Sequence, residues 1–172
     1  YKQKYKGADD IPVSAHPSIR SVPACYASSE LAVRLAKIAG ARLHILHVST
    51  AKELQLFSDE PLANKNITAE ACVAHLLFTL THYNSLGTRI KCNPAVKRKT
   101  DREALRAAVN SGLIDVIATA QAPTLLNEKE GGALKAMSGM PMIQFSLVSM
   151  LELVDEGVFS LETVVQKMCH AP

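Results

Sequence analysis

The segment Asp115-Val-Ile-Ala-Thr-Ala-Gln-Ala-Pro-Thr124 decides how this chain is expected to fold. Its apolar part, Val116 to Ala118, has the composition of a strand that is buried in a parallel sheet. A short polar turn and Pro123 follow it directly. Because α/β enzymes keep their functional groups where buried strands end, this segment predicts both a sheet and a site at its edge.

Two further apolar runs predict strands of the same kind, and helical segments separate all three. They span residues 41–48 and 66–73, ahead of the strand at 114–119. Strands separated by helices pair in parallel through right-handed crossovers, which gives an α/β architecture. That architecture is either part of a barrel or an open doubly wound sheet. No glycine-rich phosphate-binding loop follows a strand, which argues against a nucleotide-binding sheet.

The helices are predicted from apolar spacing and from the residues at their ends. Residues 24–39 place Leu31, Leu35 and Ile38 on one stripe, and Gly40 suits the position after a helix end. The other predicted helices span residues 51–57, 100–110, 142–154 and 161–168, the second of them opened by a capping box, Thr100-Asp-Arg-Glu103, and ended by Gly112.

Composition indicates a soluble globular chain with one domain's worth of core. The 172 residues are 48% hydrophobic and 20% charged, and the net charge of +3 is too small to suggest a nucleic-acid partner. The basic run Lys97-Arg98-Lys99 is interpreted as a solvated turn. No apolar run reaches the length of a membrane span. The four cysteines are widely spaced, which favours reduced thiols in a cytoplasmic protein.

The two ends of the chain suggest an internal piece of a longer polypeptide. Tyr1 is not an initiator Met, and the last predicted helix is followed at once by Ala171-Pro172. We therefore expect residues 1–172 to form a single, incomplete domain.

Several segments, taken in order, resemble the motifs of dihydroorotases. Residues 43–50 (Leu-His-Ile-Leu-His-Val-Ser-Thr) resemble the family's His-Val-Ser-Thr strand, and residues 67–78 resemble its Thr-Ala-Glu strand. Residues 91–98 (Lys-Cys-Asn-Pro-Ala-Val-Lys-Arg) are similar to the family's Met-Asn-Pro-Pro-Leu-Arg loop, and residues 115–124 to its Asp-His-Ala-Pro-His signature. The resemblance covers most of residues 11–172.

The resemblance implies a metal-dependent amidohydrolase with a (β/α)8 barrel, of which this chain supplies the C-terminal portion with about three parallel strands. In that family two zinc ions hold a hydroxide that opens the ring of dihydroorotate, and the reverse reaction closes carbamoyl-aspartate in pyrimidine synthesis. The implied protein is cytoplasmic. Its implied partner is a second copy of itself or aspartate transcarbamoylase, with no nucleic acid and no membrane.

Five residues occupy the positions that carry chemistry in the family. By resemblance, His47 stands at a metal-ligand position and Asn93 at a substrate-contacting position. Ala120 replaces the Asp that holds a metal and moves the proton. Gln121 replaces a neighbouring His, and Thr124 replaces a His that grips the substrate carboxylate. One ligand does not hold zinc, so we expect no bound zinc in this chain alone.

These replacements leave two hypotheses for function. The first is a dihydroorotase-like amidohydrolase fragment that is inactive as it stands. The second is a non-catalytic dihydroorotase-like structural partner. Ordinary structural roles also stay open: His47 as a hydrogen-bonded core residue, Asn93-Pro94 as a turn, and Glu70 as a structurally paired carboxylate. The glycine-rich segment 131–139 is either a mobile loop over the site or an ordinary connection.

Overall fold

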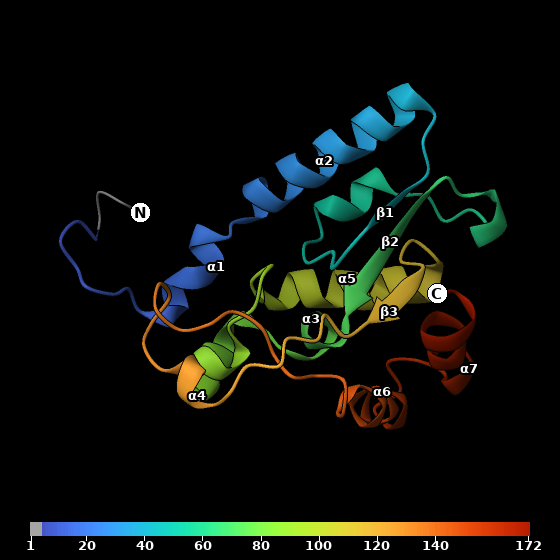
Figure 1. The fold of residues 1–172 in the computed structure, drawn as a ribbon. Coiled ribbons are helices and arrows are strands. Elements are labelled where there is room, and N and C mark those ends of the chain that lie inside the picture. The colour runs from blue at the N-terminus through green and yellow to red at the C-terminus, as the bar shows by residue number, and fades with distance from the viewer. Residues whose placement is uncertain (1–4) are drawn as a thin grey trace.

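The computed structural model describes residues 5–172, which fold as a three-stranded parallel sheet with helices around it (Figure 1). The strands are β1 (Leu43–Ile45), β2 (Ile67–Cys72) and β3 (Val116–Ala118), in the order β1-β2-β3. Leu43 pairs with Ile67, and Glu70 pairs with Val116. The predicted α/β architecture with three parallel strands is therefore confirmed. Each strand is shorter than its apolar run.

Seven helices connect and surround the strands within the described residues. They are α1 (His16–Ile19), α2 (Val22–Ala39), α3 (Val73–Leu77), α4 (Tyr83–Leu86), α5 (Lys99–Ser111), α6 (Ser146–Asp155) and α7 (Leu161–Val165). A π-helical turn, Gln166–His170, continues α7. The helix predicted at 51–57 is wrong: a single 3-10 turn, Glu53–Leu56, stands there, since so short a segment forms a stable helix only when packing supports it. No helix within residues 5–172 is long and apolar enough to cross a membrane.

The main core lies around the central strand. Ala69 and Ala71 of β2 are fully buried, and Leu76, Leu105 and Met150 pack with them from α3, α5 and α6. Figure 1 shows α5 beside β2 and β3, with α6 and α7 grouped together near the C-terminus. This core fixes the carboxyl ends of β2 and β3 relative to each other.

A buried ion pair joins the amino ends of β2 and β3. The Lys65 ammonium lies 2.7 Å from Asp115 Oδ1, and the side chains are 1% and 4% exposed. Lys65 also donates to Gly112 O at 2.7 Å, and Asp115 Oδ2 accepts from Ala69 N at 3.0 Å. Each charged group is thus hydrogen-bonded as well as paired, which is the condition under which a buried ion pair is tolerated.

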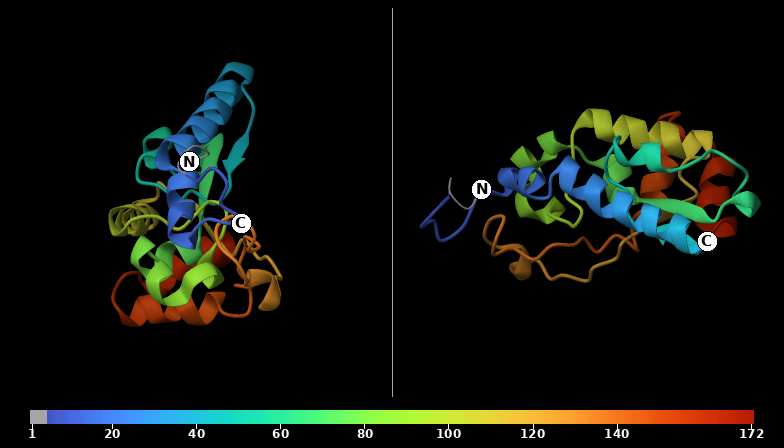
Figure 2. Two further views of the ribbon diagram at one scale, coloured as in Figure 1. Left: turned by 90° about the vertical axis from the view of Figure 1, so that its left-hand side faces the viewer. Right: turned by 90° about the horizontal axis from the view of Figure 1, so that it is seen from above.

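The apolar stripe predicted on α2 does not face this core. Leu31, Leu35 and Ile38 are 46%, 53% and 74% exposed. The buried side of α2 instead presents small residues, among them Ser29 and Ala36. Figure 2 shows α2 extending away from α6 and α7 at one side of the molecule. The helix itself is as predicted, and Gly40 ends it with a left-handed φ of 64°.

The start of α5 differs from the prediction. The helix begins at Lys99, and the capping carboxylate is Asp101, which accepts from Arg98 N at 3.3 Å and from Ala51 N at 3.0 Å. Glu103 pairs instead with Arg102 at 2.7 Å. The basic run is not a fully solvated turn, because Lys97 is 6% exposed and donates to Ala95 O at 2.8 Å. All four cysteines are free thiols, as predicted.

Candidate functional site at the strand ends

Two adjoining cavities lie where the loops after the three strands converge. The larger, about 450 Å³, is lined by His47 after β1 and by Asn93 from the segment between α4 and α5. The smaller, about 110 Å³, is lined by Asn93 again and by Ala120 after β3. The carboxyl ends of parallel strands point the same way, which is why these loops meet at one edge of the sheet. Three of the five predicted positions therefore share this edge.

His47 is held by its backbone. Its φ of 42° is unusual for a residue with a side chain, and its N–H donates to Glu70 Oε1 at 3.2 Å. The other carboxylate oxygen of Glu70 lies 3.3 Å from His44 Nε2, and His44 Nδ1 lies 2.8 Å from Thr68 Oγ1. Glu70 is thus paired structurally, which leaves the imidazole of His47 at the cavity wall.

Ala120 lies in a wall that carries no group suited to proton transfer at neutral pH. Its φ is 46°, so Ala120, like His47, has a left-handed backbone conformation after a strand end. Three titratable side chains line the same small cavity. Burial raises the pKa of the Cys72 thiol, and it raises the pKa of Cys92 to about 11. Burial also lowers the pKa of His75 to about 4. At pH 7 all three are uncharged, and none has a pKa near the working pH that a general acid or base needs.

Gln121 and Thr124 point elsewhere. Gln121 Oε1 accepts from Ile143 N at 2.8 Å, so this side chain ties the strand end to the segment before α6. Thr124 Oγ1 is buried and has no hydrogen-bond partner among residues 5–172. Neither residue lines the two cavities. The structure does not bring these two predicted positions together with Asn93.

The residues present do not fit a two-zinc centre. No three His, Cys, Asp or Glu side chains in the described part of the chain gather closely enough to hold a metal ion. His47 alone offers one imidazole, and the methyl group of Ala120 cannot ligate. Zinc sites require three or four protein ligands, so no chemical step is assigned to a metal here.

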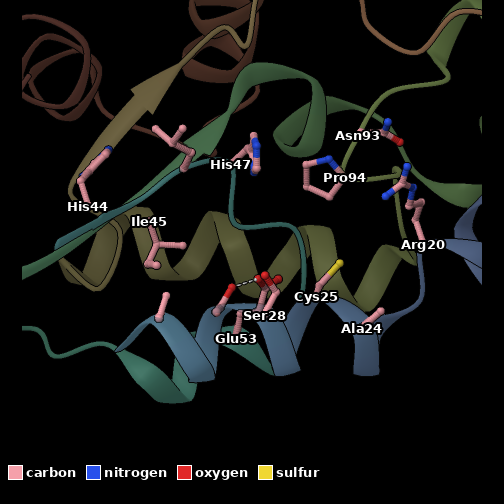
Figure 3. A pocket seen from close by; sticks show the side chains of 13 residues that line it. Arg20, Ala24, Cys25, Ser28, His44, Ile45, His47, Glu53, Asn93 and Pro94 are labelled. Carbon is pink, nitrogen blue, oxygen red and sulfur yellow. Dashed lines mark hydrogen bonds between the residues drawn. The ribbon is translucent and has the colours of Figure 1, made fainter. Parts of the chain in front are cut away.

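The wall of the larger cavity contains residues that the sequence analysis missed (Figure 3). Glu53 is buried and accepts from Ser29 Oγ at 2.7 Å and Thr50 Oγ1 at 2.8 Å, while Thr50 Oγ1 also accepts from Glu53 N at 3.2 Å. The Thr-x-x-Glu spacing of this turn is a capping signature that could have been recognised in the sequence. Arg20, between α1 and α2, lines the same cavity and carries no comparable sequence signal.

A loop formed by residues 129–140 closes one side of the smaller cavity. The buried Lys129 ammonium donates to Lys91 O at 3.0 Å, to Met137 O at 2.9 Å and to Gly139 O. Gly139 has a φ of 133°, and a Cβ there would come within 2.2 Å of the Ala122 side chain. Only glycine therefore allows this close approach. The glycine-rich segment is an anchored wall of the cavity in this structure.

Comparison with known proteins gives a consistent class. No protein-family model matches the sequence. The dihydroorotase of Aquifex aeolicus is 37% identical over 138 residues, which are 80% of this chain and 32% of that protein. The dihydroorotase of Desulfotalea psychrophila is 34% identical over 164 residues, or 93% of this chain and 38% of that protein. The chain thus spans about a third of the length of the curated relatives it matches.

Solved structures agree with this result. The L-hydantoinase (dihydropyrimidinase) of Arthrobacter aurescens superimposes with a TM-score of 0.90 at 27% identity, over 99% of this chain and 39% of that chain. The dihydroorotase of Saccharomyces cerevisiae, at 16% identity, shares the fold with a TM-score of 0.73 over 83% of this chain and 40% of that chain.

The fold and the position of the site define the class: a three-stranded portion of a (β/α)8 barrel of the amidohydrolase type. Within that class the chain is a relative of the dihydroorotases, and the resemblance expected from its motifs is confirmed.

Proposed function

We propose that this chain is the substrate-binding part of a dihydroorotase-like amidohydrolase that has lost its proton-transferring group. The observation that carries the proposal is the position of Ala120. It lies at the end of β3, beside Asn93, in a cavity whose titratable side chains are all neutral at pH 7. A ligand can be held at such a site, but opening a ring amide needs a group that gains and loses a proton.

The side chains suit binding and orientation. Asn93 offers an amide that both donates and accepts, which matches the alternating N–H and C=O groups of a cyclic amide. His47 offers an imidazole to the larger cavity. The relatives are named dihydroorotases, so the proposed ligands are dihydroorotate and carbamoyl-aspartate. A cytoplasmic role in pyrimidine synthesis follows from the same likeness and is part of the proposal.

Restoring the lost groups tests the proposal. In the protein at its natural length, the triple variant Ala120→Asp, Gln121→His, Thr124→His should raise dihydroorotate ring opening by at least about a hundredfold, the usual contribution of a general acid or base. Ala120→Asp should give the largest single gain. Ala120→Asn is the matched control, because it has the same shape as Asp and cannot transfer a proton. Rates and zinc content are measured on each variant.

Two results would contradict this proposal. The first is high activity of the unaltered protein, which would mean that catalysis needs no ionisable side chain at the position of Ala120. The second is a triple variant that binds zinc yet remains inactive, which would mean that the pocket has diverged elsewhere.

The second result would favour the other function, a non-catalytic structural partner of aspartate transcarbamoylase or of a second copy. The exposed stripe of Leu31, Leu35 and Ile38 on α2 supports that candidate, because clustered apolar side chains mark interaction surfaces. Co-sedimentation of the unaltered protein with aspartate transcarbamoylase tests it, and independent sedimentation of the two proteins would contradict it.

A further inference from the structure

The segment before α1 holds the loop of residues 129–140, which we call the wall loop because it closes one side of the smaller cavity. Asp10 makes this contact with both oxygens of its carboxylate. Its Oδ2 accepts a hydrogen bond from Gly132 N at 2.5 Å, and its Oδ1 accepts one from Leu134 N at 3.0 Å. Two segments from opposite ends of the chain are therefore joined through one carboxylate.

The backbone of the wall loop is shaped to receive this carboxylate. Gly131 has a φ of 100°, a conformation that favours glycine. At Gly132 a Cβ atom would lie 2.1 Å from Ile11 O and 2.9 Å from Asp10 Oδ1, so a side chain there would block the contact. Between the two bonds to Asp10, Ala133 N donates to Ile11 O at 2.6 Å. Backbone N–H groups that converge on one anion form a nest, and here the anion is the carboxylate of Asp10.

The carboxylate of Asp10 is ionised in this nest. Desolvation alone would raise the pKa of Asp10, but the backbone N–H groups around it lower the pKa to about 2. The neighbouring Asp9 also contacts the wall loop, through an ion pair with Lys135, but these two side chains are 90% and 51% exposed. Exposed ion pairs contribute little to stability. Asp10 is therefore the residue of this segment that we expect to hold the loop.

A series of contacts connects the nest to the smaller cavity. Within the wall loop, Ala136 N donates to Gly132 O at 3.2 Å. The buried Lys91 ammonium donates to Ala136 O, and Lys91 O accepts from Gly139 N at 2.8 Å. Gly139 lines the smaller cavity. Burial lowers the pKa of Lys91, and the negative charge of Asp10 acts in the opposite direction. A change at the nest can therefore reach the cavity through Lys91.

We propose that Asp10 is a positioning residue for the ligand site: bound in its nest, it holds the wall loop against the smaller cavity and slows the escape of a bound ligand. Asp10 lines neither cavity, so it acts through the loop and makes no contact with the ligand. That a ligand binds at this site rests on the proposed function. The effect of Asp10 on the loop does not depend on it.

Hydrogen–deuterium exchange with residue resolution, on the protein at its natural length, tests the effect on the loop. Asp10→Ala removes the acceptor of two amides, which exchange faster in any case. The informative amides are those of Met137 and Gly139, because their carbonyl acceptors lie outside the nest. If the nest holds the whole loop, these two amides should exchange at least about tenfold faster, the factor expected when hydrogen bonds to a charged group are lost.

Two further variants separate the nest from its surroundings. Asp9→Ala is the matched control, since it removes the exposed ion pair with Lys135 on the same loop. It should change the exchange by no more than about twofold. Gly132→Ala keeps the carboxylate of Asp10 but blocks its approach, and Gly132 has no positive φ, so the clash alone acts. It should reproduce the effect of Asp10→Ala.

The rate at which dihydroorotate dissociates tests the effect on the ligand. It should rise at least about tenfold in Asp10→Ala and in Gly132→Ala, by the same loss of hydrogen bonds. Unchanged exchange at Met137 and Gly139 would overturn the proposal, because Asp10 would then affect only the amides that it binds. Faster exchange with unchanged dissociation would show that the wall loop does not retain the ligand. If dihydroorotate does not bind the unaltered protein, the proposed function fails, and exchange alone decides whether Asp10 holds the loop.

Discussion

β1 and β2 are neighbouring strands of one sheet, yet the helices α2 and α5 are packed very differently. We call β2 with α5 the β2–α5 layer, and β1 with α2 the β1–α2 layer. In the β2–α5 layer, Leu105 is 1% exposed and no large hydrophobic side chain of α5 is exposed. In the β1–α2 layer, Leu35 is 53% exposed and Ile38 is 74% exposed. β2 is paired on both edges, whereas β1 pairs with β2 alone among the described strands.

The difference shows that an apolar stripe on a helix predicts burial only when the neighbouring element is present. α5 packs against α3 and so covers its apolar residues. The stripe on α2 is exposed, and one edge of β1 has no strand partner among the described residues. Exposed strand edges and apolar clusters favour association. We therefore expect the β1–α2 layer to be the part of the molecule that associates with another chain.

The largest expected effect concerns the ion pair at the start of the β2–α5 layer. Asp115→Asn leaves the Lys65 ammonium buried without its counter-charge, and should lower the free energy of unfolding by about 3–5 kcal/mol. Urea unfolding measures it. The control is Asp9→Asn, which removes an exposed pair with Lys135 and should cost less than about 1 kcal/mol. Equal losses in the two variants would contradict the difference in burial.

A smaller effect compares one leucine in each layer. Leu105→Ala removes a fully packed side chain from α5 and should cost about 2–5 kcal/mol, because a cavity remains. Leu35→Ala on α2 should change the free energy of unfolding by less than about 0.5 kcal/mol, since its side chain already meets water. A Leu35→Ala loss as large as that of Leu105→Ala would show that α2 is packed in solution.

The third prediction concerns the loss of stability in acid that is caused by His75, which lies on α3 directly after β2. Burial lowers the pKa of His75 from 6.5 to about 4, so the unfolded chain binds a proton there at a higher pH than the folded chain does. The stability from this residue is complete above about pH 6.5. It falls by up to about 3 kcal/mol as the pH drops to about 4. Thermal melts of His75→Gln should lose this part of the pH dependence, whereas the exposed His170→Gln should keep it.

The substitutions expected to change stability least lie in the β1–α2 layer, where they should clearly change self-association. We expect the 172-residue chain to self-associate, and the triple variant Leu31→Ser, Leu35→Ser, Ile38→Ser to reduce this. Sedimentation velocity measures the change. Leu161→Ser on α7, where the side chain is similarly exposed, is the control. If the unaltered chain sediments as a monomer, the exposed stripe on α2 does not cause self-association, and the prediction is contradicted.

The sequence by itself determined the elements and the class. The branched apolar runs predicted all three strands, Gly40 and Gly112 marked two helix ends, and the order of the motifs indicated the dihydroorotase relatives. The same motif order predicted that Ala120 stands where the family has an ionisable Asp, and this assignment stays a prediction. These features depend on local chemistry, which is written in neighbouring residues.

Tertiary structure alone decided how the site is charged and which face of α2 is covered. The neutral state of His75 and the burial of Lys97 result from packing by segments distant in sequence. The same packing brings Arg20 to the cavity of Asn93, across 73 residues of chain. Desolvation and side-chain contacts depend on these distant neighbours, and no local pattern specifies which neighbours they are.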